Sequence, residues 1–232
     1  MYSSHHQNLN IDQPLIVGAR SSKLSKIQVA EVFDELKQFF QVDYIPMWLE
    51  TQGDKDQKTS LRSLHKCNFF TKEVDEALLN RDCRIGIHSA KDLPDPLPKG
   101  IVMVALTRGV DSSDSLVFRD GDTIESLKSG STIATSSKKR EENVKLLRSD
   151  LQFCDVRGAV DTRLEQLDNK LFDGLVVAEA AMIRLNQTHW NRIRLPGTTT
   201  EFQGQLAILA RADDREMQQL FSFIDSRMST IK

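Results

Sequence analysis

Three short segments combine hydroxyl groups with arginine and lysine side chains where an apolar run gives way to a helical pattern. They are GARSSK at residues 18–23, TSSKKR at 135–140 and RGAVDTR at 157–163. A helix N-terminus already carries partial positive charge, so cations gathered there are unfavourable unless an anion joins them. The segments predict a site for an anionic ligand. The alternative is that each holds only an ordinary helix cap and solvated charges.

A fourth segment, IHSAKDLP at residues 87–94, adds a carboxylate to these cations. Asp92 follows Lys91, and Pro94 keeps the residue before it extended. If this loop faces the same cleft, the Asp92 carboxylate could accept hydrogen bonds from substrate N–H groups and stabilise a cationic intermediate. The alternative is a turn aspartate that pairs with Lys91. His88 is interpreted as a structural strand residue.

The elements that would position these segments alternate along the chain. Apolar runs between helical patterns are typical of an α/β protein with mostly parallel sheets, in which ligands bind at the carboxyl ends of strands. Apolar residues at helical spacing predict helices within residues 29–40 and 217–228. The strands are expected at residues 15–19, 44–50, 84–88, 102–107, 115–118, 132–135, 153–156, 175–178 and 206–210.

Turn-forming residues at two places predict that the chain passes between two domains. DSSD occupies residues 111–114, and PGTTT occupies residues 196–200. Two crossings mean that the chain leaves a first domain, builds a second and then returns.

Composition excludes several classes of protein. Of 232 residues, 39% are hydrophobic and 28% charged, which excludes general disorder. Lysine and arginine number 31 against 33 aspartates and glutamates, so a general nucleic-acid coat is excluded and an anion site must be local. No apolar run reaches the roughly 20 residues of a membrane-spanning helix. The polar N-terminus has no apolar signal segment, so we expect a cytoplasmic protein.

The cysteines indicate neither disulfides nor a metal site. Cys67, Cys83 and Cys154 are odd in number and form no CxxC pair. We therefore expect no metal.

Several motifs together resemble the porphobilinogen deaminase (hydroxymethylbilane synthase) family. They are HSAKDLP, TSSKKR, RGAVDTRLEQLDN, GARSSKLSKIQVAEV and LETQGD, and the similarity runs from about residue 15 to about 225. The resemblance implies two α/β lobes of the periplasmic-binding-protein type (type II), joined by two crossings, with the active site between them. Lobe one would comprise residues 12–108 and 204–232, lobe two residues 109–203, and residues 1–11 a flexible tail.

The resemblance also implies an activity. Family members polymerise four porphobilinogen molecules to hydroxymethylbilane with loss of ammonia, in tetrapyrrole and haem biosynthesis. A dipyrromethane cofactor bound to a cysteine primes the chain. We expect the small-molecule substrate porphobilinogen to be the binding partner. We expect no nucleic acid or membrane partner, and a monomeric protein. Asp92 matches the catalytic aspartate, and the matching binding positions are Arg20, Ser22, Lys91, Ser137, Lys139, Arg140, Arg157, Arg163 and Arg184.

The sequence departs from the family pattern at the cofactor anchor. The similarity covers only the family's first two domains, so we expect the third domain that carries the anchoring cysteine to be missing, and none of the three cysteines occupies the anchor's position. Cys67, in a segment that replaces the glycine-rich active-site loop, is a possible covalent anchor, and Lys139 stands where an arginine is expected. The alternative function is a catalytically impaired two-domain binder of porphyrin precursors or other polycarboxylates.

Overall fold

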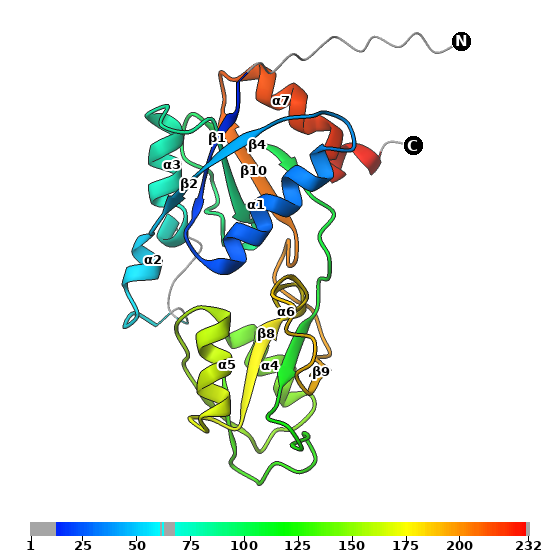
Figure 1. The fold of residues 1–232 in the computed structure, drawn as a ribbon. Helices are drawn as coiled ribbons and strands as arrows, with labels where there is room; N and C mark the ends of the chain where they lie inside the picture. The colour runs from blue at the N-terminus through cyan, green and yellow to red at the C-terminus, as the bar shows by residue number, and fades with distance from the viewer. Residues whose placement is uncertain (1–12, 61, 63–67, 231–232) are drawn as a thin grey trace, which may run out of the picture.

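The protein folds as two lobes stacked end to end (Figure 1), as a computed structural model describes it for residues 13–60, 62 and 68–230. Each lobe is built on its own five-stranded sheet with helices on both faces. The α/β two-lobe class expected from the sequence is confirmed. The tail predicted at residues 1–11 lies outside the described residues.

The sheet of the first lobe has the strand order β2-β1-β3-β10-β4. Its core divides by sheet face, because alternate residues of a strand point to opposite sides. Helices α1 and α7 share one hydrophobic cluster with Ile208, and α3 shares another with Leu209. The elements are β1 (Leu15–Arg20), α1 (Lys23–Leu36), β2 (Tyr44–Leu49), α2 (Gln52–Lys55), α3 (Lys72–Leu79), β3 (Ile85–Ser89), β4 (Ile101–Leu106), β10 (Leu206–Arg211) and α7 (Arg215–Phe221).

The sheet of the second lobe has the strand order β7-β6-β8-β5-β9. Here α5 and α6 pack on one face with Val177, and α4 packs on the other with Val176. The elements are β5 (Asp114–Val117), β6 (Thr132–Ala134), α4 (Lys138–Lys145), β7 (Gln152–Cys154), α5 (Val160–Asp168), β8 (Gly174–Ala178), α6 (Glu179–Arg184) and β9 (Arg192–Arg194).

Each sheet is mixed: four of its five strands run in the same direction, as the sequence indicates, and one strand, β10 or β5, runs against them. In the first lobe β1 pairs in parallel with β2 and β3, whereas β10 is antiparallel to β3 and β4. In the second lobe β6 pairs in parallel with β7 and β8, whereas β5 is antiparallel to β8 and β9. The antiparallel pairs arise where the chain arrives from the other lobe, because β5 and β10 each follow a crossing rather than a helix of their own sheet.

The chain passes between the sheets twice, in residues 107–113 and 195–205. The two crossings touch: a side chain at Gly204 would collide with the Asp111 backbone, and one at Gly109 would lie 2.9 Å from the Gly204 backbone. Both glycines have positive φ, +78° at Gly109 and +83° at Gly204, which other residues rarely adopt. The lobe limits given above stay a prediction, since the sheets do not fix where within a crossing one lobe ends.

The structure confirms the first of the two predicted helical faces in full and the second only in part. Val29, Val32, Phe33 and Leu36 of α1 are all buried against the sheet, as their spacing indicates. The second helix, α7, ends at Phe221, and Met228 is 62% exposed rather than part of a buried stripe.

Candidate functional site

A cavity of about 360 Å³ lies between the lobes and receives all four segments singled out in the sequence. Its volume is at the lower end of the range for small-molecule sites. The carboxyl ends of β1, β3 and β8 and the starts of α1, α4, α5 and α6 all contribute to its wall. The expected site residues on this wall are Arg20, Ser22, Lys91, Asp92, Ser137, Arg140, Arg157, Arg163 and Arg184.

The two wall serines that were expected from the sequence, Ser22 and Ser137, act as helix caps. The Ser22 side chain accepts a hydrogen bond from the Ser25 N–H at 3.2 Å, and the Ser137 side chain accepts one from the Arg140 N–H at 3.4 Å. No side chain caps α5, whose N-cap is Ala159. The alternative interpretation as caps therefore applies to two of the three junctions, although all three meet at the cavity.

Arg20 is committed to a carboxylate of its own lobe. Its Nε and Nη2 both bond Asp54, the former at 3.2 Å, and its guanidinium lies 4.7 Å from the Phe70 ring centroid. Asp54 is held in place because it closes a capping box with Thr51 at the start of α2. Burial is the largest single influence on Asp54 and raises its pKa, but the bond and charge of Arg20 together with the bonds from Thr51 outweigh burial, so the pKa of Asp54 is lowered.

Arg140 is likewise paired within the second lobe. Its Nη2 donates to Asp114 Oδ1 at 2.6 Å, and Gln203 in the second crossing donates to the same oxygen. The Asp114 side chain is 3% exposed. Arg140 is therefore tied to the start of β5 and, through Asp114, to the crossing.

Lys91 and Arg163 have no carboxylate partner among the described residues. Lys91 belongs to the 3-10 turn η3 (Ala90–Asp92), and burial, followed by repulsion from Arg140, lowers its pKa. Arg163 donates from Nε to the Gly158 carbonyl at 2.7 Å; burial and the nearby Arg140 lower its pKa to about 10. Desolvated cations that repel one another favour an added anion.

Asp92 shares this part of the cavity. Its charge is felt by both Lys91 and Arg163, raising the pKa of each against the effect of burial. It forms no ion pair with Lys91 among the described contacts, so the alternative of a simple turn pair finds no geometric basis. The neighbouring His88 is buried, and burial followed by repulsion from Arg20 lowers its pKa to about 4.

Arg157 reaches from the second lobe to the first. Its Nη2 donates to the carbonyls of Gly53 at 3.0 Å and Asp56 at 2.5 Å. The guanidinium also lies 5.8 Å and 5.9 Å from the ring centroids of Phe69 and Phe70, in the turn η2 (Asn68–Phe70). Its Nε is buried and has no hydrogen-bond partner among the described atoms.

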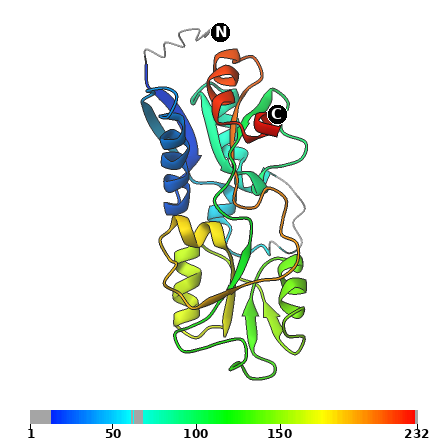
Figure 2. The same cartoon turned by 90° about the vertical axis from the view of Figure 1, so that its right-hand side faces the viewer.

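Arg184 also bridges the lobes, but through a carboxylate. It closes a two-bond pair with Glu31 of α1, and its side chain is only 5% exposed. Figure 2 shows the lower end of α1 resting on the helices of the second lobe.

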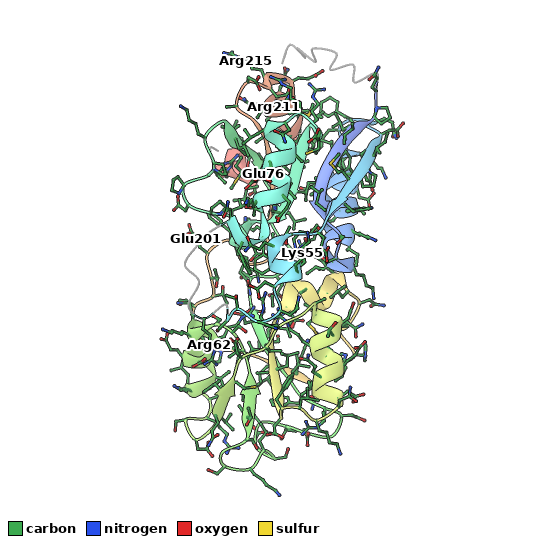
Figure 3. The ribbon with its side chains drawn as sticks, turned by 90° about the vertical axis from the view of Figure 1, so that its left-hand side faces the viewer. Lys55, Arg62, Glu76, Glu201, Arg211 and Arg215 are labelled. Atoms are coloured by element: carbon green, nitrogen blue, oxygen red, sulfur yellow. The ribbon has the colours of Figure 1, made fainter. Side chains whose placement is uncertain are left out.

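A third contact between the lobes involves Arg62, which Figure 3 places at the upper edge of the second lobe. Its Nη2 donates to the Thr135 carbonyl at 3.1 Å and pairs with Glu141 at 2.5 Å. Lys139, expected to bind ligand, is exposed and does not line the cavity. Cys67 lies outside the described residues.

Comparisons with known proteins agree with this arrangement. Residues 15–219 match the family model "Porphobilinogen deaminase, dipyromethane cofactor binding domain". The chain belongs to the porphobilinogen deaminase family. The porphobilinogen deaminase of Desulforudis audaxviator is 36% identical over 215 residues, which cover 91% of this chain and 70% of that protein. That of Exiguobacterium sibiricum is 34% identical over 224 residues, covering 93% and 71%.

Solved structures show the same fold at low identity. A periplasmic substrate-binding protein of an ABC transporter from Coxiella burnetii has a TM-score of 0.55 at 13% identity, covering 90% of this chain and 91% of its own. An ancestral arginine-binding protein has a TM-score of 0.51 at 10% identity, covering 96% and 95%. These likenesses confirm the periplasmic-binding-protein-like fold. Across the described residues, no helix meets the length and apolarity that spanning a bilayer requires.

The cavity fits the dipyrromethane cofactor of the family in charge. A dipyrromethane built from two porphobilinogen units carries two acetates and two propionates, and Lys91 and Arg163, which have no carboxylate partner among the described residues, could bind carboxylates from the cavity wall. The described cysteines, Cys83 and Cys154, do not line the cavity. In the described part of the chain no cluster of His, Cys, Asp and Glu could hold a metal ion.

Sequence reasoning missed the carboxylates that pair with the cleft arginines. Asp54 had a usable local signal, since Thr51 and Asp54 have the spacing of a capping box. Asp114 was noted only as part of a turn, and Glu31 gave no signal at all. Phe70, which lies beside both Arg20 and Arg157, was likewise not assigned to the site.

Proposed function

We propose that this chain catalyses the hydroxymethylbilane synthase reaction, joining four porphobilinogen molecules head to tail with loss of ammonia. The observation that favours this function is the position of Asp92 on the same wall as two partly buried cations that lack carboxylate partners among the described residues, Lys91 and Arg163. One wall of the cavity thus offers cations for the acetate and propionate groups of a pyrrole. The same wall offers one carboxylate for its ring nitrogen.

Each residue of the cavity wall would have a separate role in the reaction. The aminomethyl nitrogen of one porphobilinogen leaves as ammonia with the C–N electron pair, and the ring nitrogen stabilises the resulting cation. Asp92 would accept the hydrogen bond from that ring N–H and stabilise the positive charge. The free α-carbon of the neighbouring pyrrole then forms the C–C bond and loses its proton. Lys91, Arg157 and Arg163 would hold the carboxylates so that the two carbons meet. Dipyrromethane, when bound, supplies the primer to which the first unit is added.

A second candidate function is a binder of polycarboxylated pyrroles without turnover. It is favoured by the absence of Cys83 and Cys154 from the cavity wall, since a covalently attached primer needs a thiol within reach of the cavity. Cys67 is the remaining candidate anchor, and its assignment stays a proposal.

Ammonia release distinguishes the two functions. The protein is incubated with porphobilinogen, ammonia is measured against porphobilinogen consumed, and intact mass is recorded before and after. One ammonia per porphobilinogen consumed supports catalysis, and a mass increase that maps to Cys67 and disappears in Cys67→Ser identifies the anchor. Saturable binding of porphobilinogen without ammonia release would establish the binder instead.

A further inference from the structure

Arg184 differs from the other paired arginines of the cleft in where its partner comes from. Arg20 pairs with Asp54 inside the first lobe, and Arg140 pairs with Asp114 inside the second. Arg184, at the end of α6 in the second lobe, pairs with Glu31 in the middle of α1 in the first. Of these three pairs in the described structure, the Arg184–Glu31 pair is the one that joins the two lobes. A ligand that displaces Glu31 from Arg184 would therefore alter a contact between the lobes.

The Arg184 guanidinium cannot bind a ligand carboxylate with two hydrogen bonds while it keeps all its present bonds. Its Nε donates to Glu31 Oε2 at 2.7 Å, and its Nη2 donates to Glu31 Oε1 at 2.8 Å and to the Gly204 carbonyl at 2.9 Å. A guanidinium grips a carboxylate with two bonds along one of its edges. One edge is occupied by Glu31, and the edge formed by Nη1 and Nη2 requires the hydrogen that Gly204 accepts.

If Arg184 binds a ligand carboxylate with two hydrogen bonds along either of these edges, a connection between the lobes is therefore weakened. Taking the first edge displaces Glu31 and α1, whereas taking the second displaces Gly204, which lies in the second crossing. Arg184 lines the cavity, and no described residue accepts a hydrogen bond from its Nη1. A ligand carboxylate can approach from that side before any internal bond has broken.

The rest of the contact between α1 and the second lobe is modest. Leu24 packs against the hydrophobic cluster of the second lobe, and Lys23 lies 3.7 Å from Asp161 with its own side chain 64% exposed. An exposed pair of this kind contributes little. The Glu31–Arg184 pair is therefore the principal charged interaction between α1 and the second lobe in the described structure.

We propose that Glu31 is an internal competitor for Arg184, so that the Glu31–Arg184 pair is a latch between the lobes that ligand carboxylates release. The identity of the ligand as a carboxylated pyrrole rests on the proposed function; the latch itself requires only a polycarboxylate. Lys91 and Arg163, which have no internal carboxylate, take the first carboxylates without moving either lobe. Only a ligand with a further carboxylate reaches Arg184 and frees α1.

The test uses mellitate, a benzene ring with six carboxylates that cannot undergo the deaminase reaction. Calorimetry measures its affinity, and small-angle X-ray scattering measures the radius of gyration with and without it. Glu31→Gln removes the competing charge and nearly preserves the shape of the side chain. Asp34→Asn is the matched control, because it makes the same change on the same helix, where Asp34 bonds only the exposed Lys37 among described residues.

We expect Glu31→Gln to bind mellitate about three- to tenfold more tightly than the parent, as removal of one competing charge-assisted interaction predicts. Its ligand-free radius of gyration should exceed that of the parent and approach that of the mellitate-bound parent. Asp34→Asn should match the parent in both. Equal affinity and radius for Glu31→Gln and the parent would overturn the latch.

Arg184→Met supplies the second arm. In this background, Glu31→Gln should no longer change mellitate affinity, because the cation for which Glu31 competes is gone. An undiminished effect of Glu31→Gln there would also overturn the proposal. If Arg184→Met does not fold, Arg184→Gln takes its place, since a neutral amide also removes the cation for which Glu31 competes.

These outcomes are independent of turnover. Tighter mellitate binding and an expanded Glu31→Gln protein, with no ammonia from porphobilinogen, would retain the latch and reject the proposed catalysis. Ammonia release by the parent together with an inert Glu31→Gln substitution would do the reverse.

Discussion

The central wall of the cavity and the α1–α6 contact both contain cations that are shielded from solvent at least in part, but the cations are paired differently in the two places. At the centre, Lys91 and Arg163 lie next to Asp92 without a carboxylate partner and have lowered pKa values. At the α1–α6 contact, Arg184 is saturated along one edge by Glu31 and also bonds the Gly204 carbonyl. The first arrangement leaves charge available to a ligand, and the second uses charge to join two elements.

The difference shows that a buried arginine in a cleft is not by itself a binding residue. A cation whose partner is already in the protein must exchange one carboxylate for another, so its net contribution to affinity is small. A cation that was desolvated without a partner gains the whole interaction when the ligand arrives. We therefore expect Lys91 and Arg163 to dominate affinity, and Arg184 to influence the relative position of the lobes.

The largest effect is expected at Asp92, the acid of the central wall. Asp92→Asn keeps shape and hydrogen bonding but removes the charge that a cationic intermediate requires. Ammonia release should fall by about 100-fold or more, as for loss of other electrostatic stabilisers of a transition state. Mellitate should bind at least as tightly as to the parent, because Lys91 and Arg163 lose a neighbouring negative charge. A variant that retains most of an active parent's rate would remove Asp92 from the chemistry.

A smaller effect, on ligand affinity in one region and on stability in the other, is expected on replacing the arginines. Arg163→Ala should weaken mellitate binding by roughly 1.5–3 kcal/mol, the cost of a charge-assisted bond, without lowering the free energy of unfolding of the ligand-free protein. Arg184→Met should lower that free energy by about 1 kcal/mol, because it leaves Glu31 unpaired at a site 27% exposed.

Arg157→Ala provides an intermediate case, because it removes a ligand contact together with the bonds to Gly53 and Asp56. Calorimetry and denaturant unfolding measure both quantities for each variant. Equal loss of stability in Arg163→Ala and Arg184→Met would contradict the division into unpaired and paired cations.

The smallest expected effect is a decrease of mellitate affinity at alkaline pH. Binding of an anion requires Lys91 and Arg163 to be protonated, and the pKa of Arg163 is lowered to about 10. Mellitate affinity should therefore fall several-fold between about pH 8 and pH 10, while its carboxylates stay ionised. Without ligand the sign reverses: a lowered pKa means that the folded state binds fewer protons, so the free energy of unfolding rises with pH.

The double substitution Lys91→Met with Arg163→Ala should flatten the alkaline decline in affinity, whereas Arg184→Met should preserve it. Calorimetric titrations at pH 8, 9 and 10 measure the slope for each protein. An unchanged slope in the double variant would place the titrating groups elsewhere.

The sequence could predict an anion site at the four segments because their chemistry is local. Each segment follows a strand, and carboxyl ends of parallel strands meet at one edge of a sheet. The segments belong to two sheets, however, so their meeting in one cavity depends on how the crossings place the lobes and could not be predicted. The partners of the cations could not be anticipated, because Arg184 and Glu31 are 153 residues apart and Arg20 and Asp54 are 34 apart. Only the relative placement of the elements decides which cation keeps its charge free for a ligand.

The fold, like the site, has features that the local sequence predicts and features that depend on distant parts of the chain. The apolar face of α1 is encoded in fourteen residues of regular spacing, and the structure buries it as expected. Strand β9 was missed, because Arg192 and Arg194 flank its one apolar residue and it lies at the edge of its sheet. The direction of β10 was missed because it depends on where the second crossing returns the chain.

The position of β10 also has a consequence for the order of events during synthesis. β10 is the last strand of the chain, yet it lies inside the first sheet, hydrogen-bonded to β3 on one side and β4 on the other. Until the ribosome has delivered residues 206–211, β4 has no neighbour in that sheet, whereas every strand of the second sheet has already been made. The part of the protein translated in the middle can thus fold first, and the part that begins the chain is completed last.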